Sequence, residues 1–159
     1  IDHKVYSGFN YAGAELGHIV IEHKGRQCSC GRKGCWEAYS SATGLVNMTK
    51  EKMLERPDSL MWKEGGGNID NVDGKTAFDG WRAGDKAASG VVDMYINYLG
   101  CGLTNIVNTF QPEVLLIGGG IGAGVYMTYN ILIAFRYGQY IRQMERALYM
   151  CLERIICVK

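Results

Sequence analysis

The chain has 159 residues, of which 47% are hydrophobic and 21% are charged, and its formal net charge is +1. This length suffices for one well-buried domain and is short for two, so we expect a single domain over residues 1–159. Near-neutral charge without a long Lys/Arg run offers no electrostatic basis for nucleic-acid binding by this segment. The chain opens without Met or an export leader, which favours a cytoplasmic protein seen in part.

The N-terminal third is expected to contribute strands. Residues 4–11 predict a strand and a turn, and His18–Glu22 predicts a strand rich in β-branched residues. From Glu37 onward apolar residues recur at helical spacing, and Pro57 limits the helix that they predict.

The middle of the chain predicts a short helix, an exposed loop and a long helix. The short helix covers residues 58–63, and the loop covers residues 65–75, which are dense in Gly, Asn and Asp. Asp85 is a candidate N-cap for a helix that runs to about Phe110. Three glycines interrupt this helix, and because each weakens it we expect them to permit close packing against a sheet. They are Gly90, Gly100 and Gly102.

The segment after Pro112 predicts a buried strand over Glu113–Ile117, a glycine turn and a final helix from about Tyr126. Residues 114–135 carry no charge and are as long as a membrane span. Five glycines within that run fit a strand, a turn and a helix better than one membrane helix.

Three cysteines close together in sequence predict a metal site. Cys28, Cys30 and Cys35 form a C-x-C-x4-C pattern, and nine residues separate His18 from the first of them. Three thiolates and one imidazole complete the four-coordinate shell that Zn²⁺ prefers in structural sites. The alternative is that these cysteines pair as disulfides or are simply buried thiols. Three further cysteines stand singly and are assigned no function: Cys101, Cys151 and Cys157.

The glycine turn Gly118–Gly120 follows a predicted strand and precedes a predicted helix, a position at which backbone amides bind phosphate groups. Together with Ala123 it also fits the G-x-G-x-x-A dinucleotide pattern of oxidoreductases. That class expects an acidic residue about 20 positions later, and none lies between Glu113 and Glu145. A turn that needs glycine only for its geometry remains an alternative.

Three stretches carry a resemblance to a known family: GAELGH (Gly13–His18), CSCGRKGCWEAYSS (Cys28–Ser41) and NIVNTFQPEVLLIGGGI (Asn105–Ile121). The chain resembles the C-terminal part of a ROK-family sugar kinase of the bacterial glucokinase-like branch. The resemblance implies an actin-like, ribonuclease H-like α/β domain with a zinc-binding loop over residues 18–35.

The resemblance also implies roles for individual residues. It assigns a structural zinc to His18, Cys28, Cys30 and Cys35; sugar binding to Glu15, His18 and Glu37; and ATP contact to Gly118, Gly119 and Gly120. Ionised carboxylates only accept hydrogen bonds, so each can receive sugar hydroxyls, and the second His18 nitrogen can donate one. The alternatives are a surface ion pair for Glu15 and a favourable helix N-terminal charge for Glu37.

The chain lacks part of the family pattern. The phosphate loop and the catalytic Asp lie upstream of the residues present, so no residue is assigned a catalytic role, and residues 129–159 depart from the expected tail. The resemblance therefore implies the C-terminal half of an ATP-dependent hexose kinase, inactive alone, which uses ATP and Mg²⁺ when complete and commonly pairs as a homodimer. The alternatives are the sugar-sensing domain of a ROK-type transcriptional repressor and a zinc-stabilised interaction module. The sequence does not fix which hexose is bound.

Overall fold

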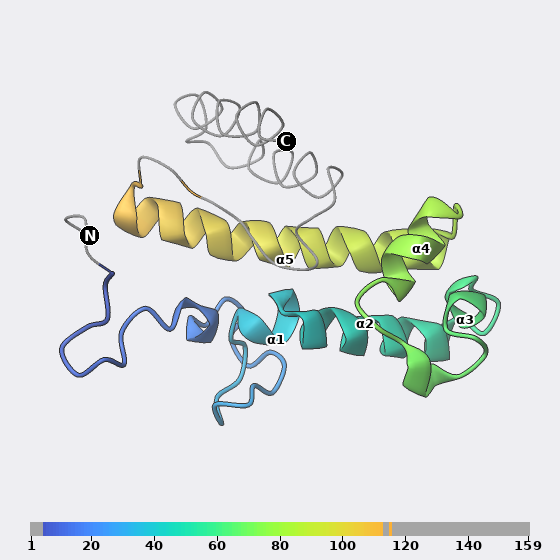
Figure 1. Ribbon diagram of the computed structural model, residues 1–159, viewed down its shortest axis with the longest axis horizontal. Coiled ribbons are helices and arrows are strands. Elements are labelled where there is room, and N and C mark those ends of the chain that lie inside the picture. The colour runs from blue at the N-terminus through green and yellow to red at the C-terminus, as the bar shows by residue number, and fades with distance from the viewer. Residues whose placement is uncertain (1–4, 113–114, 116–159) are drawn as a thin grey trace.

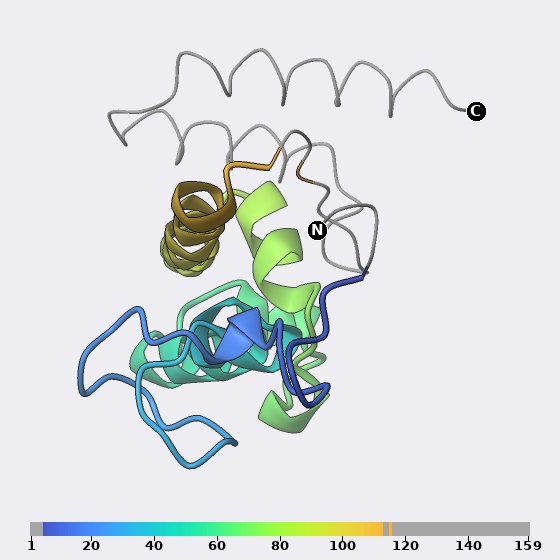
Figure 2. The same cartoon turned by 90° about the vertical axis from the view of Figure 1, so that its left-hand side faces the viewer.

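A computed structural model describes residues 5–112 and residue 115. Its elements are η1 (Leu16–His18), α1 (Glu37–Ser40), α2 (Ala42–Glu55), α3 (Met61–Glu64), η2 (Ile69–Asn71), α4 (Thr76–Arg82) and α5 (Lys86–Phe110). Helix α5 lies over α1 and α2, and α3 and α4 gather at the other end of α5 from Phe110 (Figure 1). In the view turned by 90°, the loop just before α1 projects on the side of α1 and α2 that faces away from α5, whereas the first described residues run back to the level of α5 (Figure 2).

The core lies between α2 and α5. Leu45 and Met53 of α2, and Val91 and Val92 of α5, are almost completely buried. Burying each such side chain contributes about 1.5–3 kcal/mol relative to leaving it in water. This apolar contact holds α2 and α5 together and thereby supports α1, which begins directly after the cysteine-rich loop.

The predicted N-cap of the long helix is confirmed. The Asp85 carboxylate accepts hydrogen bonds from the backbone N–H of Ala87 (2.7 Å) and Ala88 (3.4 Å), and α5 ends at Phe110 as expected. The same carboxylate also accepts from the N–H of Leu60 (2.6 Å) and from the Ser59 hydroxyl. One buried acid therefore joins the start of α3 to the start of α5.

The helix predicted from Glu37 is interrupted. It divides at Ser41, which adopts an extended backbone and whose hydroxyl accepts from the N–H of Gly44 (3.0 Å) to cap α2. Ser favours such caps because its side chain competes with helical hydrogen bonding. The predicted short helix is present as α3, which begins three residues later than expected and ends one residue later.

Helix α4 was not predicted, because its sequence contains Gly80 and borders a glycine-rich loop. The Asp73 carboxylate accepts from the N–H of Lys75 (2.8 Å) and Thr76 (3.1 Å) and organises the entry to α4. A Cβ atom at Gly80 would lie 2.9 Å from side-chain atoms of both Met61 and Ala88, so glycine is required where α3, α4 and α5 meet.

The two strands predicted in the N-terminal third are wrong. Among the described residues only isolated antiparallel bridges occur, Val20 with Cys35 and Gln27 with Lys33. His18 belongs to η1, and residues 5–11 are irregular. A β-strand needs a neighbouring strand with which to form a ladder of hydrogen bonds. Here Val20 forms one bridge, with Cys35, and the chain then turns at Lys24, whose φ is 59°. The β-branched run therefore becomes one side of a short loop.

The remaining predicted elements lie outside the described residues: most of the strand over Glu113–Ile117, the glycine turn and the final helix. Over residues 5–112 and 115, no helix combines the length and the apolar character needed to cross a membrane.

Candidate functional site

The structure brings the four predicted metal ligands together. One ligand atom from each of His18, Cys28, Cys30 and Cys35 lies within 4.8 Å of the others. The Cys28 Sγ is 3.6 Å from His18 Nδ1, and the Cys30 and Cys35 Sγ atoms are 3.6 Å apart. None of these cysteines is in a disulfide. The disulfide alternative is therefore wrong for these three, whereas metal binding stays a prediction.

The separations fit a tetrahedral zinc shell. Zinc–sulfur bonds of about 2.3 Å and zinc–nitrogen bonds of about 2.0–2.1 Å at tetrahedral angles place neighbouring ligand atoms about 3.6–3.8 Å apart. Both measured pairs match this spacing, and a disulfide would require about 2.05 Å. Cys28 and Cys35 are buried while Cys30 is exposed, so the cluster sits at the edge of the molecule.

The backbone folds the loop tightly around these side chains. The N–H of Cys28 donates to the carbonyl of Arg32 (2.9 Å), and the N–H of Gly31 donates to the carbonyl of Cys28 (3.1 Å). Gly31 and Gly34 adopt φ values of +88° and +81°, which favour glycine. A Cβ at Gly34 would lie 1.7 Å from the carbonyl oxygen of Glu22, so this glycine is also required sterically.

The cysteines differ in how readily they ionise. A hydrogen bond from the backbone N–H of Arg32 lowers the pKa of Cys30 to about 6. Burial raises the pKa of Cys35 to about 11. A metal that bound here would replace these protons, since thiolates are the coordinating form.

Both predicted sugar-binding acids lie beside the cluster. Glu15 is exposed, and its carbonyl accepts from the N–H of His18 (3.0 Å), which places the two residues one turn apart at η1. Glu37 is half-buried in the first turn of α1, and its Oε2 lies 3.4 Å from where a Cβ on Gly17 would stand. Glu15 therefore directly precedes η1, His18 ends it and Glu37 begins α1, while the role of these three residues in sugar binding stays a prediction.

Sequence reasoning missed three contacts of the loop. The Ser29 hydroxyl donates to Glu37 Oε1 (3.3 Å), and the Arg32 guanidinium donates to the carbonyl of His18. The Arg26 guanidinium forms a two-bond ion pair with Glu51 of α2 (2.7 and 2.6 Å). Single polar residues within or beside a cysteine-rich loop look the same in sequence whether their side chains make such contacts or face water.

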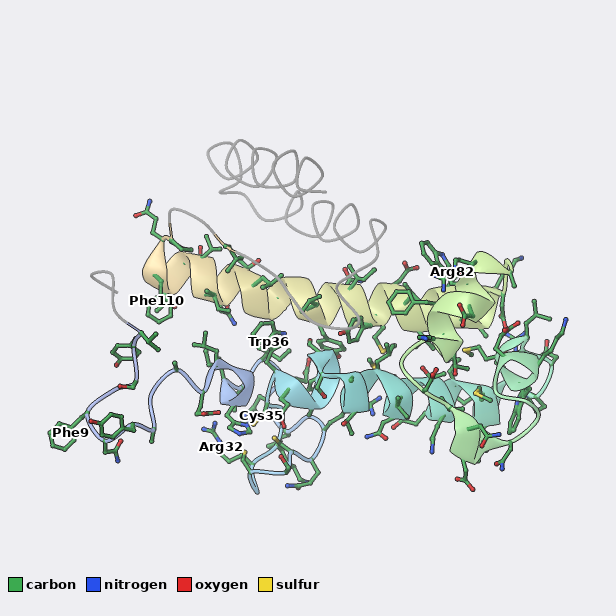
Figure 3. The ribbon with its side chains drawn as sticks, viewed as in Figure 1. Phe9, Arg32, Cys35, Trp36, Arg82 and Phe110 are labelled. Atoms are coloured by element: carbon green, nitrogen blue, oxygen red, sulfur yellow. The ribbon has the colours of Figure 1, made fainter. Side chains whose placement is uncertain are left out.

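Trp36 fixes the junction between the loop and the helices. It lies between Cys35 and Glu37 in sequence, and its side chain points toward α5, away from Arg32 (Figure 3). The indole N–H donates to the carbonyl of Tyr98 (2.9 Å). A candidate metal ligand and a candidate sugar-binding acid thus flank a residue that is anchored on the longest described helix.

The predicted ATP-contacting glycines, Gly118, Gly119 and Gly120, lie outside the described residues. Of the glycines expected to pack closely within α5, Gly102 does so, against Trp36 instead of a sheet. Gly90 does not, because a Cβ atom placed on it would meet nothing within 4 Å.

Comparison with known proteins places this arrangement in a family. The sequence profile described as the ROK family matches residues 1–153. A glucokinase from Thermotoga maritima is 37% identical over 115 residues, which are 72% of this chain and 36% of that protein. A xylose repressor from Bacillus subtilis is 32% identical over 123 residues, which are 76% of this chain and 27% of that protein. The chain thus spans about a third of the length of these curated relatives.

A solved structure is also similar. A ROK family glucokinase from Streptomyces griseus, in complex with glucose and AMPPNP, has a TM-score of 0.77 and 31% identity, and the match covers 86% of this chain and 45% of that chain. Structural neighbours of this family imply the actin-like ATPase fold. The chain belongs to the ROK family.

Proposed function

We propose that this chain is the C-terminal, sugar-binding part of an ATP-dependent hexose kinase that phosphorylates glucose or a related sugar. The observation that carries the proposal is the convergence of four metal-type ligand atoms within 4.8 Å, with Glu37 packed beside the turn that holds His18. The similarity to a glucokinase bound to glucose and AMPPNP supports the sugar and nucleotide classes.

The zinc in this proposal is structural. Its ligands would be His18, Cys28, Cys30 and Cys35. The ion would supply a fixed cross-link in this loop, where the described residues form only isolated β-bridges and no β-ladder. Four protein side chains would fill all four positions around the ion, so it would have no open position at which to activate water.

Sugar recognition follows from the same geometry. The Nδ1 of His18 faces Cys28, so the proton of this neutral ring resides on Nε2 when Nδ1 is a ligand, and Nε2 then donates to a sugar hydroxyl. The carboxylates of Glu15 and Glu37 accept from hydroxyls, and their placement selects sugars by the direction in which each hydroxyl points.

Phosphoryl transfer requires further parts. We assign ATP contact to Gly118, Gly119 and Gly120, with Mg²⁺ neutralising phosphate charge, and we place the phosphate loop and the catalytic Asp in an upstream domain. The chain alone is accordingly expected to be inactive. We further propose a cytoplasmic homodimer, as is common for the family.

The direct test replaces Glu15 with Gln in the complete enzyme. Glucose phosphorylation should fall by about tenfold or more in kcat/KM, because one hydrogen bond to a charged acceptor is lost. Zinc content should not change. Glu55→Gln, an exposed acid that pairs with Lys52 on α2, is the control and should leave kinetics unaltered. Unchanged kinetics in Glu15→Gln would contradict the assignment.

A second candidate function is the sugar-sensing domain of a ROK-type transcriptional repressor. The similarity to a xylose repressor favours it. The gene sequence upstream of residue 1 separates the two: a phosphate loop with a catalytic Asp supports the kinase, and a helix-turn-helix supports the repressor.

A further inference from the structure

The side chain of Ser29 joins the cysteine-rich loop to the Glu37 carboxylate of the proposed sugar site. Ser29 lies between Cys28 and Cys30, and its hydroxyl donates to Oε1 of Glu37 at 3.3 Å. The two residues are eight positions apart, and Glu37 is the first residue of α1. No other hydrogen bond from the described residues reaches the Glu37 carboxylate.

The second oxygen of Glu37 lies beside Gly17. Oε2 and Cβ of Glu37 each lie 3.4 Å from where a Cβ on Gly17 would stand, so the Glu37 side chain lies next to the position that a side chain at residue 17 would take. The Ser29 hydroxyl therefore orients the carboxylate, and the absence of a side chain at Gly17 leaves the room in which it lies. A glutamate held in this way loses less rotamer freedom on binding a ligand than a free one.

We propose that Ser29 is a positioning residue, which orients the Glu37 carboxylate for a sugar hydroxyl; this inference rests on the proposed function. Ser29 has the right place for this because both of its neighbours are candidate metal ligands. When they are held by the ion, the backbone of Ser29 is fixed, and so is the direction from which its hydroxyl meets Oε1. A carboxylate oxygen has more than one acceptor site, so Oε1 can bond to Ser29 and still receive a sugar hydroxyl.

The expected effect is modest, because 3.3 Å is long for an O–H···O hydrogen bond and Ser29 is exposed. Ser29→Ala should weaken glucose binding by about 3- to 10-fold, the range of one neutral-donor hydrogen bond. The stoichiometry of bound zinc should stay the same, since the Ser29 side chain is not a ligand. Ser29→Thr keeps the hydroxyl and should restore most of the affinity.

The experiment measures glucose dissociation constants by calorimetry, without ATP, for the zinc-loaded complete enzyme and its variants. A panel of monodeoxyglucoses supplies the decisive readout. A deoxy sugar that lacks the hydroxyl bound by Glu37 should bind equally well to the unsubstituted enzyme and to Glu37→Gln, and this identifies that hydroxyl. Ser29→Ala should likewise leave the affinity for that sugar unchanged. Ser89→Ala is the matched control, because it also removes a serine hydroxyl, one that donates to the carbonyl of Asp85, the N-cap residue of α5.

Three results would overturn the role of Ser29: unchanged glucose affinity in Ser29→Ala, an equal loss for every deoxy sugar, or a loss of zinc. An equal loss would show a general loosening of the loop instead of a specific orientation of Glu37. If the unsubstituted enzyme binds none of the hexoses, the proposed function fails and this inference fails with it. If it binds glucose and Ser29→Ala binds glucose equally well, only the inference fails.

Discussion

The indole ring of Trp36 lies directly against the backbone of Gly102, 66 positions later in the chain. A Cβ at Gly102 would stand 1.9 Å from Cε2 of the ring, and the indole N–H reaches the carbonyl of Tyr98, one helical turn before Gly102. Because a side chain at position 102 would overlap the indole ring, only glycine there lets the ring approach the carbonyl of Tyr98. The contact fixes the start of α1, and with it the positions of Cys35 and Glu37 on either side of Trp36.

Replacing Gly102 with Ala should therefore destabilise the protein although Ala favours helices. The methyl group would overlap backbone-anchored ring atoms, and overpacking of this kind costs about 1–3 kcal/mol. Gly90→Ala is the matched control in the same helix, because nothing lies within 4 Å of its Cβ position, and it should stabilise by up to about 1 kcal/mol. Urea unfolding measures both. A stabilised Gly102→Ala variant would contradict the contact.

Tyr39 should control how firmly the loop holds the proposed zinc. Its buried hydroxyl accepts from the N–H of Arg26 at 2.7 Å, so Tyr39→Phe leaves that N–H unpaired at a cost of about 1 kcal/mol. We expect faster transfer of zinc to a coloured chelator. Tyr95→Phe, which removes an equally buried hydroxyl bonded to the carbonyl of Ser40, should lower stability without changing the transfer rate. Equal transfer rates in the two variants would refute this role.

Asp85 should make stability depend on pH. Burial alone would raise its pKa, but hydrogen bonds from the Ser59 hydroxyl and from the N–H groups of Ala87, Ala88 and Leu60 hold its pKa below the usual value. A depressed native pKa contributes stability that is present above the unfolded pKa, about 3.9, and is lost as the pH falls through the native value.

Asp85→Ala should thus cost about 1–2 kcal/mol at pH 7, and the difference from the unsubstituted protein should shrink as the pH falls below about 4. Asp58→Ala removes only an exposed ion pair with Arg56 and should cost less than about 1 kcal/mol. Urea unfolding at pH 7 and at about pH 3.5 measures both effects. A cost for Asp85→Ala that grows with acidity would show that the sign is wrong.

The sequence predicts the features that depend on nearby residues. The spacing of Cys28, Cys30 and Cys35 gathers their sulfurs within one short loop, and Asp85 caps the helix that starts beside it. Both depend on local chain geometry, which spacing and residue type encode. The family resemblance, carried by the same short motifs, is likewise confirmed.

The features that the sequence predicted wrongly, or did not indicate, depend on partners that are distant in the chain or on the direction of one side chain. The run after His18 has the composition of a strand, but without an adjacent ladder it forms a single bridge with Cys35. The packing of Trp36 on Gly102 joins segments whose pairing no local pattern indicates. Ser29 gives no signal at all, since a serine between two cysteines looks the same in sequence whether it contacts Glu37 or water.

Zinc K-edge X-ray absorption on the purified protein tests the central claim most directly. We expect one zinc per chain, with three sulfur ligands at about 2.3 Å and one nitrogen ligand at about 2.0–2.1 Å. Replacing His18 with Ala should remove the nitrogen contribution and leave the sulfur shell. Protein that carries no zinc when purified without chelator, or zinc bound mainly by oxygen, would contradict the account.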